Sequence, residues 1–282
     1  MSGHRLQIGN VEVLALSDGR LQFFPSEFFP TVSEADWEPY RDQLEADGSI
    51  VLNVGSFLLR SDGRTVLVDT GLGESSEGMP NAVSGLLLKD MADNGVRPDE
   101  VDMVVVTHLH RDHVGWNLVW DDDVFRPTFR NARYWIPRAD WDTFAPRART
   151  RALSYIRDQV LPLEGLGILE LMDGEQPLTS ELTALPTPGH TPGHTSVLIA
   201  SDGERGIVLG DAAHVPAQAQ ETHWSPSADM DPERSRVTRR DLMDRMERDE
   251  AVVVSGHFPS PGYGRLARLR GRRYWRAHVD TG

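Results

Sequence analysis

A cluster of metal-binding residue types directly follows a short apolar segment, and this combination constrains the chain more than any other feature. Residues 101–107 are nearly all apolar, which is typical of a strand buried on both faces of a sheet. The sequence continues His108-Leu-His110-Arg-Asp112-His113. Side chains at positions i and i+2 of extended backbone point the same way, so His108 and His110 can converge on one ion. A turn would bring Asp112 and His113 to a second ion nearby.

Three later segments carry the same residue types beside glycine, namely Thr-Pro-Gly-His190, Leu-Gly-Asp211 and Ser-Gly-His257. Each adjoins a strand-like segment, and loops at strand ends are where sites are commonly assembled. The glycines allow the backbone to turn sharply there. Because the chain has no cysteine, any metal site must use imidazole and carboxylate ligands, which suit zinc, iron or manganese.

Length and charge limit the class of protein and its partners. A chain of 282 residues with 39% hydrophobic and 26% charged residues can bury a substantial core, and we expect one domain over residues 1–282. The net charge of −14 disfavours nucleic acid as a partner and fits a small, neutral or weakly charged substrate. Residues 1–10 lack the apolar core of a signal peptide, and no apolar segment has transmembrane length, so we expect a cytoplasmic protein without a membrane partner. A homodimer is compatible with the sequence.

The order of strand and helix patterns predicts an α/β fold. Strands are expected at residues 11–16, 50–60, 64–68, 101–107, 196–200, 206–209 and 251–255. Helices are expected at residues 34–46, 81–94 and 148–161, and in a segment that begins with Asp231 as N-cap and Pro232 in the first turn. The Arg-rich residues 265–276 alternate with apolar residues, which indicates a terminal strand or hairpin rather than an anion site. Two sheets that face each other, with helices outside, would satisfy this order.

Residues 23–48 separate the first two strands and begin with aromatic residues and prolines. We expect this excursion to pack over the core. A lid or one wall of a substrate pocket is the functional alternative, because long insertions with apolar tips often line binding sites.

The motif His-x-His-x-Asp-His, followed by the later His, Asp and His, resembles that of the metallo-β-lactamase superfamily, and Val-Asp69-Thr-Gly resembles the family's first motif. The resemblance spans roughly residues 50 to 260. It implies a four-layer αββα sandwich of two mixed sheets with helices outside. It also implies two divalent metal ions, with zinc expected first and manganese or iron as alternatives.

Ligand roles follow from the same resemblance. It implies that one metal is held by His108, His110 and His190, the other by Asp112, His113 and His257, with Asp211 as a bridge. Of the two histidines in the tandem Thr-Pro-Gly-His repeat, the pattern favours His190 over His194. Asp69 would orient ligands or loops through hydrogen bonds rather than bind metal.

Three side chains are expected to take part in catalysis. Two ions about 3.5 to 4 Å apart can share a water and lower its pKa towards neutrality, which yields a bridging hydroxide as nucleophile. Asp211 would hold the ions at that distance, and Asp112 could pass a proton to the leaving group. His214, in the motif Gly-Asp-x-x-His, could donate a hydrogen bond to the substrate oxygen. Related lactonases often carry a Tyr at that position.

The extended motifs His-x-Asp-His-Val-Gly-Trp116-Asn117 and Gly-Asp-x-x-His resemble those of the group of acyl-homoserine lactone lactonases and methyl parathion hydrolase-like enzymes. β-Lactamase members typically lack the bridging Asp or use a Cys ligand, and glyoxalase II adds a helical domain after its last ligand. We therefore expect an enzyme that hydrolyses a lactone or another carboxylic ester, with phosphotriester hydrolysis as the alternative. A mononuclear iron oxidoreductase or an inactive binding module on the same fold would be expected to have lost ligands that this sequence retains.

Overall fold

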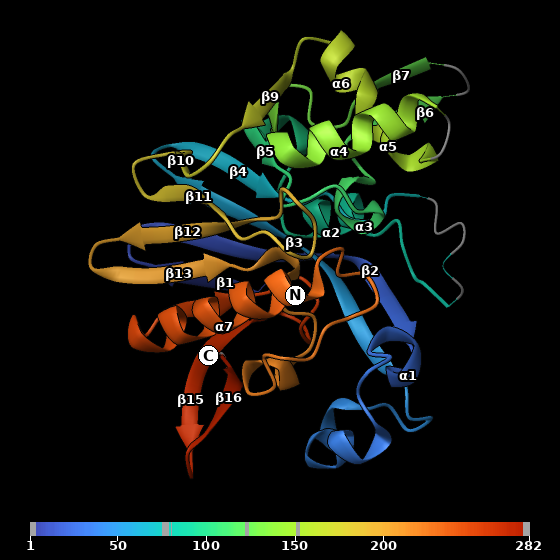
Figure 1. The fold of residues 1–282 in the computed structure, drawn as a ribbon. Coiled ribbons are helices and arrows are strands. Elements are labelled where there is room, and N and C mark those ends of the chain that lie inside the picture. Colours follow the sequence, from blue (N-terminus) through green and yellow to red (C-terminus); the bar gives the residue numbers. More distant parts are fainter. Residues whose placement is uncertain (1–3, 75–78, 80, 122–123, 151–152, 279–282) are drawn as a thin grey trace.

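A computed structural model describes residues 4–74, 79, 81–121, 124–150 and 153–278 of the chain, and two sheets of seven strands dominate this part (Figure 1). In spatial order, the first sheet consists of β1 (Arg5–Ile8), β2 (Val11–Phe23), β3 (Ile50–Ser61), β4 (Arg64–Val68), β5 (Met103–Val105), β8 (Arg133–Pro137) and β9 (Leu169–Met172). The second consists of β10 (Gln176–Pro177), β11 (Leu182–Pro186), β12 (Thr195–Ser201), β13 (Glu204–Val208), β14 (Val252–Val254), β15 (Tyr263–Leu269) and β16 (Arg272–Ala277).

Both sheets are mixed, as predicted. Strands β4, β5, β8 and β9 pair in parallel within the first sheet, and β13 pairs in parallel with β14 in the second. The other strand pairs of the two sheets, such as β3 with β4 and β12 with β13, are antiparallel. A separate antiparallel hairpin is formed by β6 (Leu118–Asp121) and β7 (Val124–Pro127).

The two sheets pack face to face, and side-chain alternation along β5 shows how. Met103 and Val105 lie in the hydrophobic core between the sheets, whereas Val104 lies in the core beneath the outer helices. A strand buried on both faces must be apolar at consecutive positions. This explains the uninterrupted apolar segment from which the strand was predicted.

Helices cover the outer faces of the sheets (Figure 1). Over the first sheet lie α2 (Leu87–Asp93), α4 (Arg138–Arg149), α5 (Ser154–Gln159) and α6 (Leu161–Gly165). Over the second lies α7 (Pro232–Arg248), whose Leu242, Met243 and Met246 pack with Ile207 and Val253. The order helix, sheet, sheet, helix is the predicted four-layer sandwich. Short helical segments occupy the connections: α1 (Pro25–Phe28), α3 (Arg111–Val114), η1 (Glu34–Gln43), η2 (Pro98–Glu100), η3 (Gly210–Ala212) and η4 (Pro216–Ala219).

Most predicted strands are present, and the start of α7 was placed correctly. The side chain of Asp231 accepts a hydrogen bond from the backbone N–H of Arg234 at 3.1 Å, which is the expected N-cap contact. The Arg-rich tail forms the antiparallel hairpin of β15 and β16, as predicted. Strand β2 is longer than expected and continues past an irregularity between Ser17 and Gly19.

The helix predicted at residues 81–94 was wrong in its first half, because α2 begins only at Leu87. Asn81 has a φ of 67°, and Val83 exchanges two backbone hydrogen bonds with Arg20 of β2. Gly85 then has a φ of 84°. Pairing with the sheet therefore overrides the helical periodicity of the apolar residues.

The single helix predicted at residues 148–161 was also wrong. Helix α4 ends at Arg149, α5 is a separate segment, and α6 begins at Leu161; residues 151–152 lie outside the described residues. Val160 has φ −122° and ψ −49°, which ends α5, and Pro162 sits in the first turn of α6. The helix expected at residues 34–46 is the 3₁₀ segment η1, which Pro39 and the non-helical Tyr40 interrupt.

The excursion of residues 23–48 consists of α1 and η1 and extends beyond the end of β2 (Figure 1). Its aromatic residues belong to a hydrophobic cluster that also contains residues of β2 and β3, and in it Phe29 and Trp37 pack against Trp224. Within the described part of the chain, no helix combines the length and apolar character needed to cross a membrane.

Candidate metal centre

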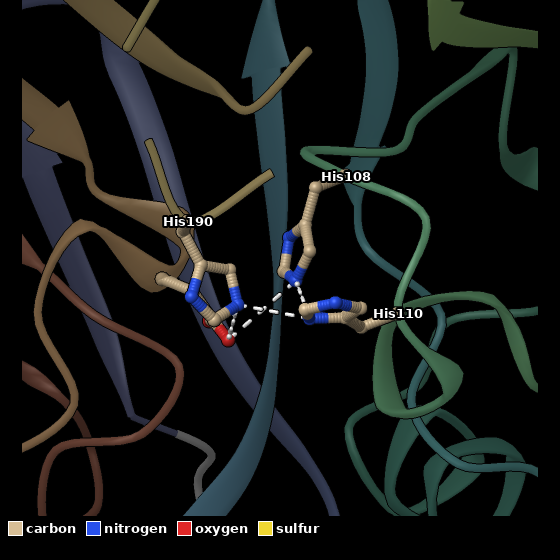
Figure 2. A group of neighbouring side chains, drawn as sticks. His108, His110 and His190 are labelled. Carbon is tan, nitrogen blue, oxygen red and sulfur yellow. Dashed lines mark hydrogen bonds and ion pairs between the residues drawn. The ribbon is translucent and has the colours of Figure 1, made fainter. Parts of the chain in front are cut away.

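The first four predicted ligands lie directly after β5. His108 and His110 follow the strand, and α3 then carries Asp112 and His113. Nε2 of His108 is 3.1 Å from Nδ1 of His110, so both rings point to one place, as Figure 2 shows. The single turn of α3 returns the next two side chains to the same region. The structure therefore brings the four side chains of this motif together, and their role as metal ligands stays a prediction.

The other three residues come from loops at the ends of strands in the second sheet. His190 precedes β12, Asp211 lies in η3 after β13, and His257 follows β14. Nε2 of His190 is 2.9 Å from Nδ1 of His110 and 3.2 Å from Oδ2 of Asp211. Oδ1 of Asp211 lies 3.1 Å from Nε2 of His257 and 3.3 Å from Nε2 of His113. Oδ2 of Asp211 thus faces His190, Oδ1 faces His113, and His257 lies near both oxygens.

These side chains have the composition and placement of two adjacent cation sites. Potential ligand atoms within 4.8 Å of one another are offered by His108, His110, His190 and Asp211. A second such group consists of Asp112, His113 and His257. Nε2 of His113 and Oδ1 of Asp211 are buried, and although they lie 3.3 Å apart, neither is aligned for a hydrogen bond with any described residue. Because unpaired buried polar atoms are costly, their presence here fits a cation between them.

The backbone of the His190 loop requires glycine. Gly189 has a φ of 137°, and a Cβ at this position would lie 2.4 Å from the backbone nitrogen of Ser235 in α7. Backbone hydrogen bonds join the same loop to the start of the helix, from Asp231 N to Gly189 O and from Met230 N to His190 O. The glycine therefore allows the loop to pack directly on the chain around the start of α7.

The second histidine of the tandem repeat has a scaffold role. Nε2 of His194 accepts a hydrogen bond from the backbone N–H of Asp211 at 2.8 Å, and Nδ1 donates to the carbonyl of Thr187 at 2.9 Å. A Cβ on Gly210 would lie 2.6 Å from that Nε2 atom. His194 therefore holds the backbone of Asp211, while His190 enters the cluster. Of the two histidines, His190 is the one that the family pattern favoured for the cluster.

Asp69 orients residues of the cluster through hydrogen bonds to Thr107 and His113. Its Oδ1 accepts a hydrogen bond from the backbone N–H of Thr107 at 2.7 Å, and its Oδ2 accepts from the hydroxyl of Thr107 and from Nδ1 of His113, both at 2.8 Å. With Nδ1 engaged in this way, Nε2 of His113 faces the centre. This contact is the orienting role that the resemblance implied.

Two further carboxylates support the centre and were not predicted from the sequence. Asp140 of α4 is fully buried. It accepts hydrogen bonds from the backbone N–H groups of Leu109 and Gly193 and from the hydroxyl of Thr191. Asp140 therefore joins the loop of His108 and His110 to the loop of His190. Oδ1 of Asp229 lies 2.9 Å from Nδ1 of His190. Neither aspartate belongs to a recognisable local motif, and no signal in one sequence points to them.

Burial and carboxylates act in opposite directions on the histidines. Burial lowers the pKa of His110 to about 3 and that of His108 well below its usual value, which favours the neutral imidazole that binds metals. Burial also opposes protonation of His190, but hydrogen bonds to Asp211 and Asp229 outweigh it and raise the pKa to about 9. The carboxylates thus favour positive charge at the centre.

His214 lies beside the predicted ligands. Its Nε2 is 3.2 Å from Oδ2 of Asp211, and its Nδ1 is buried without a partner among the described residues. Burial lowers its pKa to about 4, so the ring is neutral at pH 7 and carries one N–H. The ring packs edge-on against Phe28 of the excursion, with centroids 5.2 Å apart. Asp211, His214 and His257 form a third group able to hold a cation.

A cavity of about 340 Å³ opens onto this centre. Its polar lining includes the predicted ligands His110, Asp112, His190, Asp211 and His257, together with His214. Much of the remaining lining is apolar: Leu21, Phe23, Phe28, Leu52 and Met79. Phe23 and Phe28 belong to the excursion, which therefore contributes one wall of the cavity.

Similarity to known proteins agrees with this geometry. Residues 50–257 match the profile of the metallo-beta-lactamase superfamily. The chain is 27% identical to the N-acyl homoserine lactonase AiiA of Bacillus thuringiensis subsp. kurstaki over 222 residues, which cover 73% of this chain and 81% of AiiA. It is 28% identical to an N-acyl homoserine lactonase of a Bacillus species over 222 residues, with the same coverage.

Two solved structures are similar over nearly their whole length. One is AidC, a dizinc quorum-quenching lactonase in complex with a product. It matches this chain with a TM-score of 0.83 at 22% identity, and the match covers 100% of this chain and 99% of AidC. The hydrolase AbOPH, in the beta lactamase superfamily, has a TM-score of 0.83 at 21% identity and covers 99% of each chain. At such identities these likenesses establish the fold.

Proposed function

The chain belongs to the metallo-β-lactamase superfamily, and from this membership we propose that it hydrolyses the ester bond of a small neutral substrate, a lactone or another carboxylic ester, using two divalent metal ions. The resemblance to acyl-homoserine lactone lactonases that the motifs predicted is confirmed by the sequence relatives. So is the broader class, a metal-dependent hydrolase that acts on ester bonds.

The convergence of the predicted ligands on a cavity with an apolar wall carries this proposal. The polar side places imidazole and carboxylate groups around Asp211, and the apolar side offers leucine, phenylalanine and methionine side chains. A pocket with this division suits a substrate that has a reactive polar group at one end and a hydrocarbon portion at the other. An N-acyl lactone has this form, and the names of the relatives support that substrate class.

One metal would be held by His108, His110 and His190, the other by Asp112, His113 and His257, with Asp211 in contact with both. The dizinc centre of AidC supports zinc as the metal. When bound, two such ions would supply a hydroxide nucleophile from a shared water near neutral pH and stabilise charge that develops on the carbonyl oxygen.

The residues of the chain would orient the substrate and move its protons. The carboxylate of Asp112 lines the cavity and would carry a proton to the oxygen of the leaving group. The imidazole of His214 would donate a hydrogen bond to a substrate oxygen. Phe23 and Phe28 would contact the hydrocarbon portion, which makes the excursion a wall of the substrate pocket.

An activity screen tests the proposal. Protein reconstituted with zinc or manganese is assayed on N-acyl homoserine lactones of several chain lengths, simple lactones, aryl esters, phosphotriesters and β-lactams, with the metal-depleted protein as control. We expect metal-dependent turnover of lactones to exceed that of the other classes. Turnover confined to phosphotriesters would instead favour the alternative assignment, and no turnover of any ester would contradict the proposed function.

A further inference from the structure

A fully buried guanidinium lies behind the candidate metal centre. Arg239 of α7 has no exposed surface and is the largest of the fully buried side chains in the described chain. It donates hydrogen bonds to the carbonyl oxygens of Ala212, Thr222 and Trp224, to the carboxylate of Asp229 and to the hydroxyl of Ser235. The guanidinium thus joins one helix to three separate points of the preceding loops.

One of these contacts leads to His190. Nη2 of Arg239 lies 3.3 Å from Oδ2 of Asp229, and Oδ1 of the same carboxylate lies 2.9 Å from Nδ1 of His190. Because Asp229 accepts the proton on Nδ1, Nε2 of His190 is the nitrogen that faces the other predicted ligands. Arg239 therefore orients His190 through one intervening carboxylate.

The other contacts lead to Asp211 and His214. Nε of Arg239 donates to the carbonyl of Ala212, the residue after Asp211, at 2.6 Å. Nη1 donates to the carbonyl of Trp224 at 2.6 Å, and that oxygen also accepts from the side-chain amide of Gln218 at 2.9 Å. The amide oxygen of Gln218 accepts from the backbone N–H of His214 at 2.7 Å.

A purely structural need explains this arrangement poorly. Burying a charged pair is costly, and well-packed apolar side chains of similar volume commonly stabilise a fold as well or better. A guanidinium, in contrast, presents five N–H donors in a rigid planar fork, so it fixes several acceptors relative to one another. Apart from Ser235 of α7 itself, the acceptors here all lie in the segment between β13 and α7, which carries Asp211 and, through Asp229, contacts His190.

Resting on the proposed function, we propose that Arg239 is a positioning residue of the metal centre, which sets the orientation of His190 through Asp229 and the places of Asp211 and His214 through backbone carbonyls. Loss of this guanidinium, or of the Asp229 carboxylate, loosens the ligand geometry and lowers metal affinity. The two residues act as one unit, so their effects on metal affinity are not additive.

The test compares Arg239→Gln, Arg239→Lys, Asp229→Asn and the double variant Arg239→Gln/Asp229→Asn with a matched control. Met246→Ala serves as control, because Met246 is buried on the same helix in a hydrophobic cluster and makes none of these polar contacts. Zinc affinity is measured by competition with a chromophoric chelator. The visible spectrum of the cobalt-substituted protein reports ligand geometry, and urea unfolding of the metal-free protein reports stability.

We expect Arg239→Gln and Asp229→Asn to weaken zinc binding about 10- to 100-fold and to alter the cobalt spectrum, with little further loss in the double variant. Arg239→Lys keeps the charge and should recover part of the affinity. Met246→Ala should lose stability but keep the affinity and spectrum of the wild-type protein.

Wild-type affinity and an unchanged spectrum in Asp229→Asn and Arg239→Lys would overturn the inference, and so would an equal loss of affinity in Met246→Ala. These outcomes are independent of ester hydrolysis. A wild-type protein that binds zinc but hydrolyses no ester would contradict the proposed function alone, whereas a wild-type protein that binds no zinc would contradict both.

Discussion

Nδ1 of His113 lies 2.8 Å from Oδ2 of Asp69, a residue 44 positions earlier in the chain. The same carboxylate accepts hydrogen bonds from the backbone and the hydroxyl of Thr107, which begins the motif. Asp69 follows β4, so the end of one strand fixes the ligand loop that follows the neighbouring strand. Both oxygens of Asp69 act only as acceptors in this arrangement.

Asp69→Asn should therefore impair the centre. The amide supplies one oxygen and one NH₂ group, so either the backbone N–H of Thr107 loses its acceptor, or the hydroxyl of Thr107 and Nδ1 of His113 both lose theirs. Asparagine tolerates the φ of 62° at this position, so the backbone is not strained. We expect metal affinity and kcat/KM to fall about 10- to 100-fold, measured by chelator competition and steady-state kinetics. Asp202→Asn, at an exposed turn position with φ 45°, is the control, and equal behaviour of the two variants would refute the role.

Asp211→Ala should abolish activity and lower metal content. The carboxylate of Asp211 lies between the two groups of predicted ligands, with Oδ2 3.2 Å from Nε2 of His190 and Oδ1 3.3 Å from Nε2 of His113, and alanine offers no oxygen to either group. Circular dichroism should show that the fold survives, and elemental analysis should show metal loss. Near-normal turnover by the well-folded variant would contradict a bridging role.

Protein reconstituted with zinc or manganese should contain two metal ions per chain. Each predicted group offers three or more imidazole or carboxylate ligands, which is enough to hold one ion. Elemental analysis after desalting measures the ratio, and removal of metal with a chelator should abolish activity that added zinc restores. A reproducible ratio near one would rule out the dinuclear mechanism.

The ion pairs of Glu247 predict a dependence of stability on pH. Hydrogen bonding to Arg268, supported by Arg273, lowers the pKa of Glu247 to about 2. A pKa lower in the folded than in the unfolded protein stabilises the fold above the unfolded pKa of about 4.3, and this contribution is lost as pH falls towards 2. Glu247→Gln should therefore cost about 1 kcal/mol at pH 7 and close to nothing near pH 2. Urea unfolding across this range measures it, and a difference independent of pH would contradict the ion-pair origin.

The sequence predicted which side chains gather at the candidate site better than it predicted the residues that support them. The residues from His108 to His113 are adjacent, and their types and spacing express the chemistry directly. Asp140, Asp229 and Arg239 act through contacts between distant segments, and each is a common residue in an unremarkable local sequence. Such contacts exist only once the sheets and helices have assembled.

The same distinction applies to the fold. Strands such as β5 were predicted because burial on both faces imposes apolar side chains at every position. The helix expected at residues 81–94 failed because Val83 pairs with Arg20 of β2, a contact between segments far apart in the sequence. Apolar residues at helical spacing favour a helix, but the contacts that a segment makes in the folded protein decide its backbone conformation.

His214 provides the sharpest test of the catalytic arrangement, because its neutral ring carries a single N–H and its Nε2 lies among the predicted ligands, 3.2 Å from Oδ2 of Asp211. If the ring donates a hydrogen bond to the substrate oxygen, His214→Ala should lower kcat about 10- to 1000-fold at unchanged metal content. Loss of metal in this variant would instead make His214 a ligand, and unchanged kinetics would make it part of the scaffold. His214→Tyr should restore lactone hydrolysis, because a phenol can donate the same bond from a longer side chain. If the Tyr variant is as slow as the Ala variant at equal metal content, the position does not serve the substrate oxygen.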